Sequence, residues 1–213
     1  IQWFTLLQNI APKKCSNNLH IYLLLTEFNK VLPEKKNTMI TPQHVNSAFT
    51  YGCKDNNKIV IFRYEEWKKV LIHETFHSFN LDFHDNTFNE LKKSLKNLFQ
   101  IKSDFLVFET YCETFASIWY CGFEAYEMSK RKRQDFTRYL ETMLAFEQQY
   151  FTYQASKILN HFNCNYMTLK NNQCSNYKEN TNVFCYYILK PVCFIHLNEF
   201  IKLNISTIGN FNN

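Results

Sequence analysis

The chain has 213 residues, a net charge of +5, 21 Phe and 13 Tyr, but only three Gly and four Pro. This length suits one domain, or one with a small appendage. Few helix breakers favour a mainly helical protein. The absence of any run of 18 apolar residues excludes an evident membrane span, and the modest charge gives no reason to expect nucleic-acid binding. Because the sequence begins with Ile1, we expect a piece of a longer or processed chain.

The first part of the chain predicts a helix followed by a β-hairpin. Residues 18–32 (NLHIYLLLTEFNKVL) favour a helix that ends at Pro33. Residues 46–52 and 58–63 are rich in β-branched and aromatic side chains, and residues 53–57 between them are typical of a turn.

The rest of the chain predicts helices and one loop. A helix is expected over 65–79, closed by Asn80, because Asn tolerates the left-handed conformation. The apolar spacing of Phe88, Leu91, Leu95 and Leu98 predicts the next helix. The further expectations are helices at 104–121 and 134–160, a solvated basic corner at 130–133, a loop at 162–180, two short helices joined at Pro191, and a frayed tail after Asn204.

The sequence HETFH, residues 73–77, carries the chemistry expected of a metal site. On a helix, His73 and His77 lie one turn apart on the same face, so both imidazoles can bind one zinc ion. Glu74 lies beside the first ligand and can take a proton from a zinc-bound water. Two ordinary histidines on an amphipathic helix remain the alternative.

A catalytic zinc ion needs a third protein ligand and an open position. His84 follows His77 closely, but it lies one place later than the third histidine of the metzincin pattern, and that pattern's glycine is Asn80 here. Asp82 and Asp85 are also near, but they need a sharp turn back after the helix.

The third candidate is the sequence FETYCETF, residues 108–115. Glu109 and Glu113 are four residues apart and face one way on a helix. One carboxylate could bind zinc while the other holds the free N–H of a ligand histidine. Two glutamates among so many apolar residues are costly unless paired or metal-bound. A solvent-facing pair is the alternative.

HExxH followed on a later helix by ExxxE resembles the gluzincin class of zinc metallopeptidases, and FETYCETF is similar to the third-ligand helix of the anthrax lethal factor type. Residues 45–83 also resemble uncharacterised metallopeptidase-like proteins of large DNA viruses. The first resemblance implies that Glu109 is the zinc ligand and that Glu113 lies behind it, although the reverse assignment stays open. It also implies Glu74 as base and a peptide or protein substrate.

With that resemblance, we expect one zincin-like metallopeptidase domain over 1–213, α+β and mainly helical, with a small β hairpin or sheet before the active-site helix. Its parts are an N-terminal helix and hairpin (1–64), the active-site and third-ligand helices (65–123), and a C-terminal helical part (124–213). The enzyme would hydrolyse peptide bonds with a water activated by Glu74.

Peptide hydrolysis also needs a donor for the developing oxyanion. The candidates are Tyr186, Tyr187, His161 and His196, and at most one of the two adjacent tyrosines should reach the zinc. Arg63 either meets a substrate carboxylate or forms a surface salt bridge with Glu65 or Glu66.

The eight cysteines contain no CxxC pair, so a zinc ribbon is not indicated. We expect reduced thiols and a cytoplasmic protein, or one of the host cytoplasm or a virion if the A+T-rich residue usage reflects a virus; a disulfide framework is the alternative. Two other functions stay open: a non-catalytic binding or virion protein of zincin fold with a retained metal site, and a helical domain without metal. The oligomeric state is not predicted.

Overall fold

The computed structural model describes residues 2–82, 87–99, 101–130 and 132–209. Its strands are β1 (Asn18–Thr26), β2 (Ala48–Thr50) and β3 (Asn56–Arg63). Its helices are α1 (Gln2–Ile10), α2 (Pro42–Val45), α3 (Trp67–Ser78), α4 (Thr87–Phe99), α5 (Val107–Met128), α6 (Arg133–His161), α7 (Tyr166–Lys170), the π-helix η1 (Phe184–Leu189), α8 (Lys190–Ile195) and α9 (Leu197–Gly209). The protein is therefore α+β and mainly helical, as the sequence predicts.

The three strands form one sheet in the order β1-β3-β2. The predicted hairpin is confirmed: β2 runs antiparallel to β3, with Ala48 opposite Ile61. The β1 strand runs parallel to β3 on the other side, with Ile21 opposite Ile59. The central strand is thus β3, and β2 is an edge of the sheet.

The prediction of a helix over 18–32 is wrong, because its first part is the strand β1. A short apolar run such as Ile21–Leu25 fits either a strand or a helix, and its own periodicity does not decide between them. The deciding interactions are backbone hydrogen bonds to β3, more than thirty residues later in the chain. Such long-range pairing overrides local preference.

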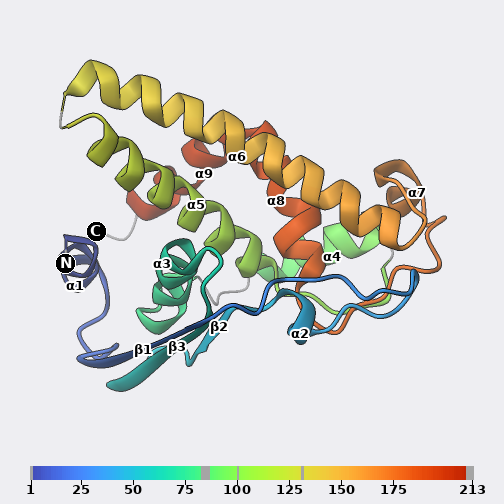
Figure 1. Ribbon diagram of the computed structural model, residues 1–213, viewed down its shortest axis with the longest axis horizontal. Helices are drawn as coiled ribbons and strands as arrows, with labels where there is room; N and C mark the ends of the chain where they lie inside the picture. Colours follow the sequence, from blue (N-terminus) through green and yellow to red (C-terminus); the bar gives the residue numbers. More distant parts are fainter. Residues whose placement is uncertain (1, 83–86, 100, 131, 210–213) are drawn as a thin grey trace.

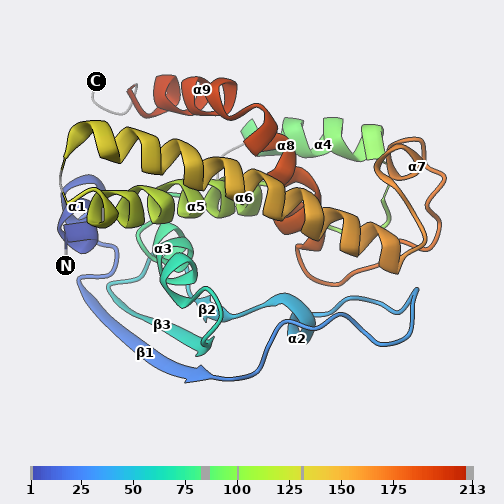
Figure 2. The ribbon, with the colours of Figure 1, turned by 45° about the horizontal axis from the view of Figure 1, so that its top comes forward.

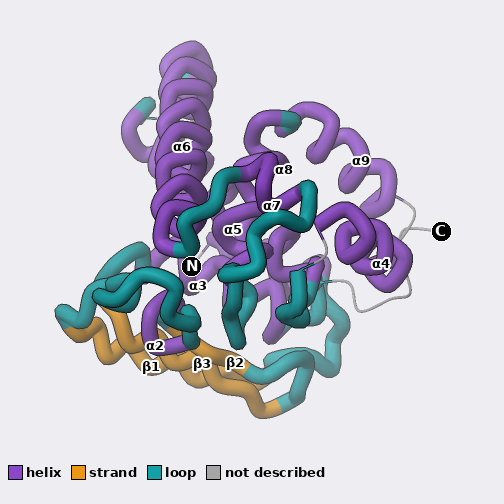
Figure 3. The backbone as a smooth tube through the Cα atoms, turned by 90° about the vertical axis from the view of Figure 1, so that its right-hand side faces the viewer, coloured by secondary structure: helices purple, strands orange, loops and turns teal. Residues whose placement is uncertain are grey.

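Helices α3, α5, α6 and α8 lie on one side of the sheet, while the short α2 lies at its end, as Figures 1 and 2 show. Helix α3 packs directly on the sheet through Val70, which joins Ile59 and Ile61 in one apolar cluster. On its other side α3 contacts α5 through Ile72 and Phe76. The view in Figure 3 shows the strands gathered below this helical part. The HETFH helix is therefore held between the sheet and α5.

Most predicted helices are present, with shifted ends. Helix α3 begins two residues later than expected, and Asn80 adopts the left-handed conformation with φ 58° that was predicted to close it. Helix α5 continues past Gly122 to Met128, beyond the expected end at residue 121. The basic corner does lie between α5 and α6, although Arg131 is outside the described residues.

The C-terminal predictions need more correction. The short helix α7 lies within the segment predicted as a loop. The helical path runs from η1 through Pro191 into α8 without a break, and the break comes instead at His196. Helix α9 runs to Gly209, past the point where a frayed tail was expected.

Two disulfides, Cys15–Cys53 and Cys164–Cys174, overturn the prediction of reduced cysteines in a cytoplasmic protein. Disulfides form and persist in oxidising environments. Buried thiols behave as small hydrophobes, which is how the free Cys112, Cys121 and Cys185 pack in the interior. No helix among the described residues is both long and apolar enough to cross a membrane.

Candidate metal centre

His73 and His77 lie one turn apart on α3 and face α5. Asn80 ends the helix in the left-handed conformation, and the Leu81 N–H donates to the Phe76 carbonyl over 2.7 Å. This bond is typical of the Schellman closure of a helix. The chain turns back sharply as a result, and Asp82 comes to lie beside His77.

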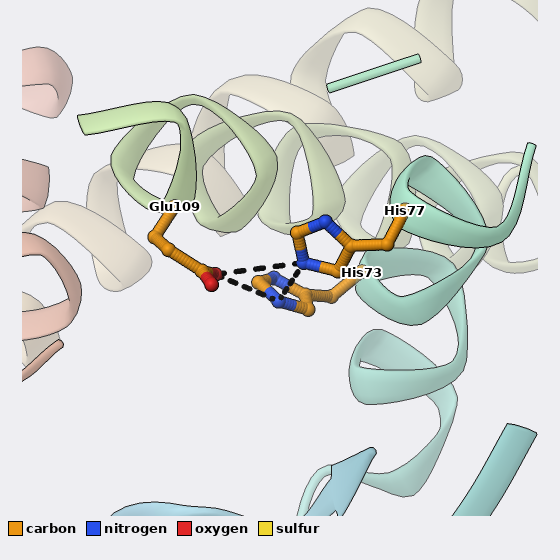
Figure 4. A group of neighbouring side chains, drawn as sticks. All are labelled: His73, His77 and Glu109. Carbon is orange, nitrogen blue, oxygen red and sulfur yellow. Dashed lines mark hydrogen bonds and ion pairs between the residues drawn. The ribbon is translucent and has the colours of Figure 1, made fainter. Parts of the chain in front are cut away.

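Glu109 comes from the first turn of α5 and points at the two histidines (Figure 4). The Nε2 atoms of His73 and His77 are 3.1 Å apart. Glu109 Oε2 lies 3.3 Å from Nε2 of His73 and 3.5 Å from Nε2 of His77. The three side chains are buried or nearly so, and together they could hold a metal ion.

The partners of the two histidines lie at their Nδ1 atoms, which leaves both Nε2 atoms available to a cation between them. Nδ1 of His77 hydrogen-bonds to Asp82 Oδ2 over 2.7 Å, and Nδ1 of His73 lies 3.2 Å from Glu113 Oε1 in an ion-pair contact whose geometry is not that of a hydrogen bond. An imidazole that donates from Nδ1 keeps a lone pair on Nε2. With Nδ1 protonated in both rings, the two Nε2 lone pairs face Glu109 Oε2, which lies 3.3 and 3.5 Å from them.

The shifted pKa values of His77 and Glu109 also favour a positive charge at the centre. Burial lowers the pKa of His77, but hydrogen bonds to Asp82 and Glu109 outweigh it and raise the pKa to about 10. Burial raises the pKa of Glu109, but the two histidines lower it to about 2. The centre thus attracts positive charge strongly, and either a proton or a metal ion satisfies it.

Each of the three donors is oriented by a partner of its own. Asp82 contacts Nδ1 of His77, and Glu113 contacts Nδ1 of His73, as described above. The side-chain N–H of Asn182 donates to Glu109 Oε1 over 3.3 Å, while Asn182 Oδ1 accepts from the Leu106 N–H over 3.1 Å. The sequence predicted only Glu113 of these three; Asp82 was considered as a ligand, and Asn182 was missed.

Lys190 binds Glu113, and this contact was not predicted from the sequence either. Its ammonium donates to Glu113 Oε2 over 2.7 Å, and the side chain is fully buried. Burial lowers the pKa of Lys190 to about 8, although Glu113 counteracts this. Burial also opposes ionisation of Glu113, but Lys190 and His73 more than offset it and hold the pKa of Glu113 well below its usual range. A lysine within the apolar sequence FCYYILKPV was the available signal.

A cavity of about 370 Å³ opens beside His73, and Glu74 lines it; His77 and Glu109 are not among its lining residues. The Glu74 side chain is buried, and this burial raises its pKa despite the nearby histidines. The lining also includes Ala48, the first residue of the edge strand β2, and Ser47 just before it. A substrate in this cavity would therefore meet both Glu74 and the sheet edge.

Both predicted tyrosines line this cavity, but only one is next to a histidine ring. The rings of Tyr186 and His73 are 6.3 Å apart at their centroids, whereas Tyr187 packs against Tyr186 at 6.5 Å. Burial raises the pKa of Tyr186 well above its usual value, so its hydroxyl keeps the proton. Both come from η1, and π-helical turns are frequent at functional sites.

The other predicted groups lie elsewhere. His161 lies within hydrogen-bonding distance of the Thr38 carbonyl, and His196 is at the break between α8 and α9. Arg63 is buried and donates to three backbone carbonyls, so the expected salt bridge or substrate contact is wrong. His84 and Asp85 are outside the described residues.

No protein-family model, curated protein or solved structure matches this chain significantly. The assignment of a function therefore depends on the geometry of the centre and its cavity.

Proposed function

We propose that this protein is a zinc metallopeptidase of gluzincin type, with a zincin-like fold. The supporting observation is the spacing of 3.1, 3.3 and 3.5 Å between the donor atoms of His73, His77 and Glu109. A tetrahedral zinc ion with bonds of 2.0–2.1 Å holds its ligand atoms roughly 3.3 Å apart. Catalytic zinc sites use three protein ligands of this kind and leave the fourth position open.

The roles of the remaining side chains follow from their positions. When bound, zinc lowers the pKa of water and polarises a peptide carbonyl. Glu74 takes a proton from the attacking water and later gives it to the leaving amine. The Tyr186 hydroxyl donates to the developing oxyanion; what supports this role is that Tyr186 lines the cavity together with His73, with the two ring centroids 6.3 Å apart.

The edge strand β2 supports a peptide as the substrate. The Phe62 N–H donates to the Ser47 carbonyl over 3.0 Å, so Ser47 is bonded toward β3. In an antiparallel pair the direction alternates along the strand, and the N–H and C=O of Ala48 therefore point outward. Ala48 also lines the cavity. An extended peptide can add to such an edge as a further strand, which brings its backbone beside Glu74.

The test compares the unchanged protein with Glu74→Gln and His77→Ala. We expect one zinc per chain by elemental analysis, retained in Glu74→Gln and lost in His77→Ala. We expect cleavage of a mixed fluorogenic peptide library, reduced at least 100-fold in Glu74→Gln. Absence of bound zinc, or full activity of Glu74→Gln, would refute the proposal. Zinc binding without any cleavage would favour the non-catalytic metal-site protein instead.

A further inference from the structure

Lys190 lies deep in the protein, at the junction of η1 and α8. Its side chain is fully buried, and its ammonium lies 3.6 Å from the centre of the Phe151 ring. Burying a charged lysine is expensive unless it is paired and hydrogen-bonded. Here the paired group is Glu113, over 2.7 Å.

The contact between Lys190 and Glu113 continues to the metal centre. Glu113 Oε2 accepts from Lys190, and Glu113 Oε1 lies 3.2 Å from His73 Nδ1. The Nε2 atom of the same imidazole faces Glu109. One carboxylate is thus shared between a buried ammonium and a donor histidine, so any rotation of Glu113 that favours one contact strains the other.

The nearby Lys69 offers a comparison. It is also buried and also lies near Phe151, with its ammonium 5.3 Å from the ring centre. However, Lys69 pairs with Glu66 over 2.9 Å, and Glu66 in turn binds Lys30 over 3.0 Å. Neither contact reaches a donor atom of the metal centre, so Lys69 acts on Glu113 through its charge alone and makes no hydrogen bond to it.

We propose that Lys190 is a positioning residue of the metal centre, which fixes and neutralises the Glu113 carboxylate so that it holds His73 in the orientation that binds the ion. This inference depends on the metal site of the proposed function and not on peptide hydrolysis. Partners that orient metal ligands typically contribute 10- to 100-fold in metal affinity. Lys190 should act at this scale, and only through Glu113.

A double-mutant cycle on zinc affinity tests this, with competition against a chromophoric chelator as the measurement. Lys190→Met should weaken zinc binding about 10-fold or more, and Glu113→Gln should weaken it about 10- to 100-fold. The double variant should bind no more weakly than Glu113→Gln alone, because Lys190 has no route to His73 once the carboxylate is gone. Lys69→Met is the matched control: it removes a buried charge near Glu113 that makes no hydrogen bond to it, so it should weaken zinc binding clearly less than Lys190→Met.

Lys190→Met leaves Glu113 without its cation and could fail to fold, which circular dichroism would reveal. The comparison of Glu113→Gln with the double variant then decides, since both lack the buried carboxylate. Equal affinities support the inference; a further loss in the double variant overturns it, as does wild-type affinity in a folded Lys190→Met. If the unchanged protein binds no zinc, the proposed function fails first, whereas bound zinc with an unaffected Lys190→Met refutes this inference alone.

Discussion

Asp82 holds His77 from a position five residues later in the chain, with Asp82 Oδ2 2.7 Å from His77 Nδ1. The contact exists because Asn80 turns the chain back immediately after α3. The sequence suggested Asp82 as a candidate third ligand, but the structure places it on the far nitrogen of the imidazole. Glu109 occupies the third place beside the two Nε2 atoms.

Replacing Asp82 by Asn should therefore weaken metal binding without removing a donor atom. The amide can still accept from Nδ1–H but lacks the negative charge that makes Nε2 a better donor, so we expect about a 10-fold loss in zinc affinity. Chelator competition measures it. Asp104→Asn is the control, since Asp104 pairs with Lys92 and Lys96 away from the centre. Equal affinity of Asp82→Asn and the unchanged protein would contradict the assignment.

Tyr186 and Tyr187 should differ in their effect on hydrolysis. Removing one donor to a developing oxyanion typically costs 100- to 1,000-fold in kcat. We expect that loss for Tyr186→Phe with little change in KM, because the hydroxyl acts only as charge develops. Tyr187→Phe, which removes the same hydroxyl from a neighbouring cavity residue, should lose much less. Steady-state kinetics on the zinc-loaded protein measure these losses in kcat. Equal losses for the two variants would argue against Tyr186 as the donor.

Glu179 should make stability depend on pH. Its carboxylate accepts from the N–H groups of Val183 and Phe184 at the start of η1 and from the Tyr177 hydroxyl. Burial raises the pKa of Glu179 to about 7, more than these hydrogen bonds lower it. The folded protein then keeps a proton that the unfolded chain loses from about pH 4.5 upward. Glu179 therefore contributes stability at low pH, and this contribution is lost as pH rises to 7.

The expected loss between pH 5 and pH 8 is about 2 kcal/mol in the free energy of unfolding. Other groups titrate in this range, so the measurement is the difference between the unchanged protein and Glu179→Gln in urea unfolding at the two pH values. Glu179→Gln should show a flatter pH dependence. A steeper one would mean that the carboxylate is stabilised by the η1 N–H groups more than burial destabilises it.

The two disulfides should contribute unequally to stability. The Cys15–Cys53 bond closes a loop with a sequence separation of 38, and Cys164–Cys174 one of only 10. Loop-closure entropy gives about 4 kcal/mol for the first and about 3 kcal/mol for the second. Paired Cys→Ala variants, compared by chemical unfolding, should show this order. Identical unfolding midpoints under oxidising and reducing conditions would show instead that the bonds do not form.

The centre could be predicted from sequence where its parts are local. His73, Glu74 and His77 follow from one helical turn, and Glu109 with Glu113 from another, so spacing alone places each set on one face. Asn182 and Lys190 could not be found this way, because each reaches α5 through a contact more than 70 residues away in the chain. The strand β1 was missed for the same reason, since its partner β3 lies far along the sequence.

The position of Asn182 and Lys190 has a consequence for how the protein is made. During synthesis the two histidines and Glu109 leave the ribosome well before Asn182 and Lys190, which bind Glu109 and Glu113. A nascent chain ending near residue 180 would hold all three donors and yet lack two of the groups that align them. If the proposed metal site is correct, tight capture of an ion would belong to the last stage of maturation, after η1 and α8 dock on α5, and metal loading would show that the carboxyl-terminal part has reached its place.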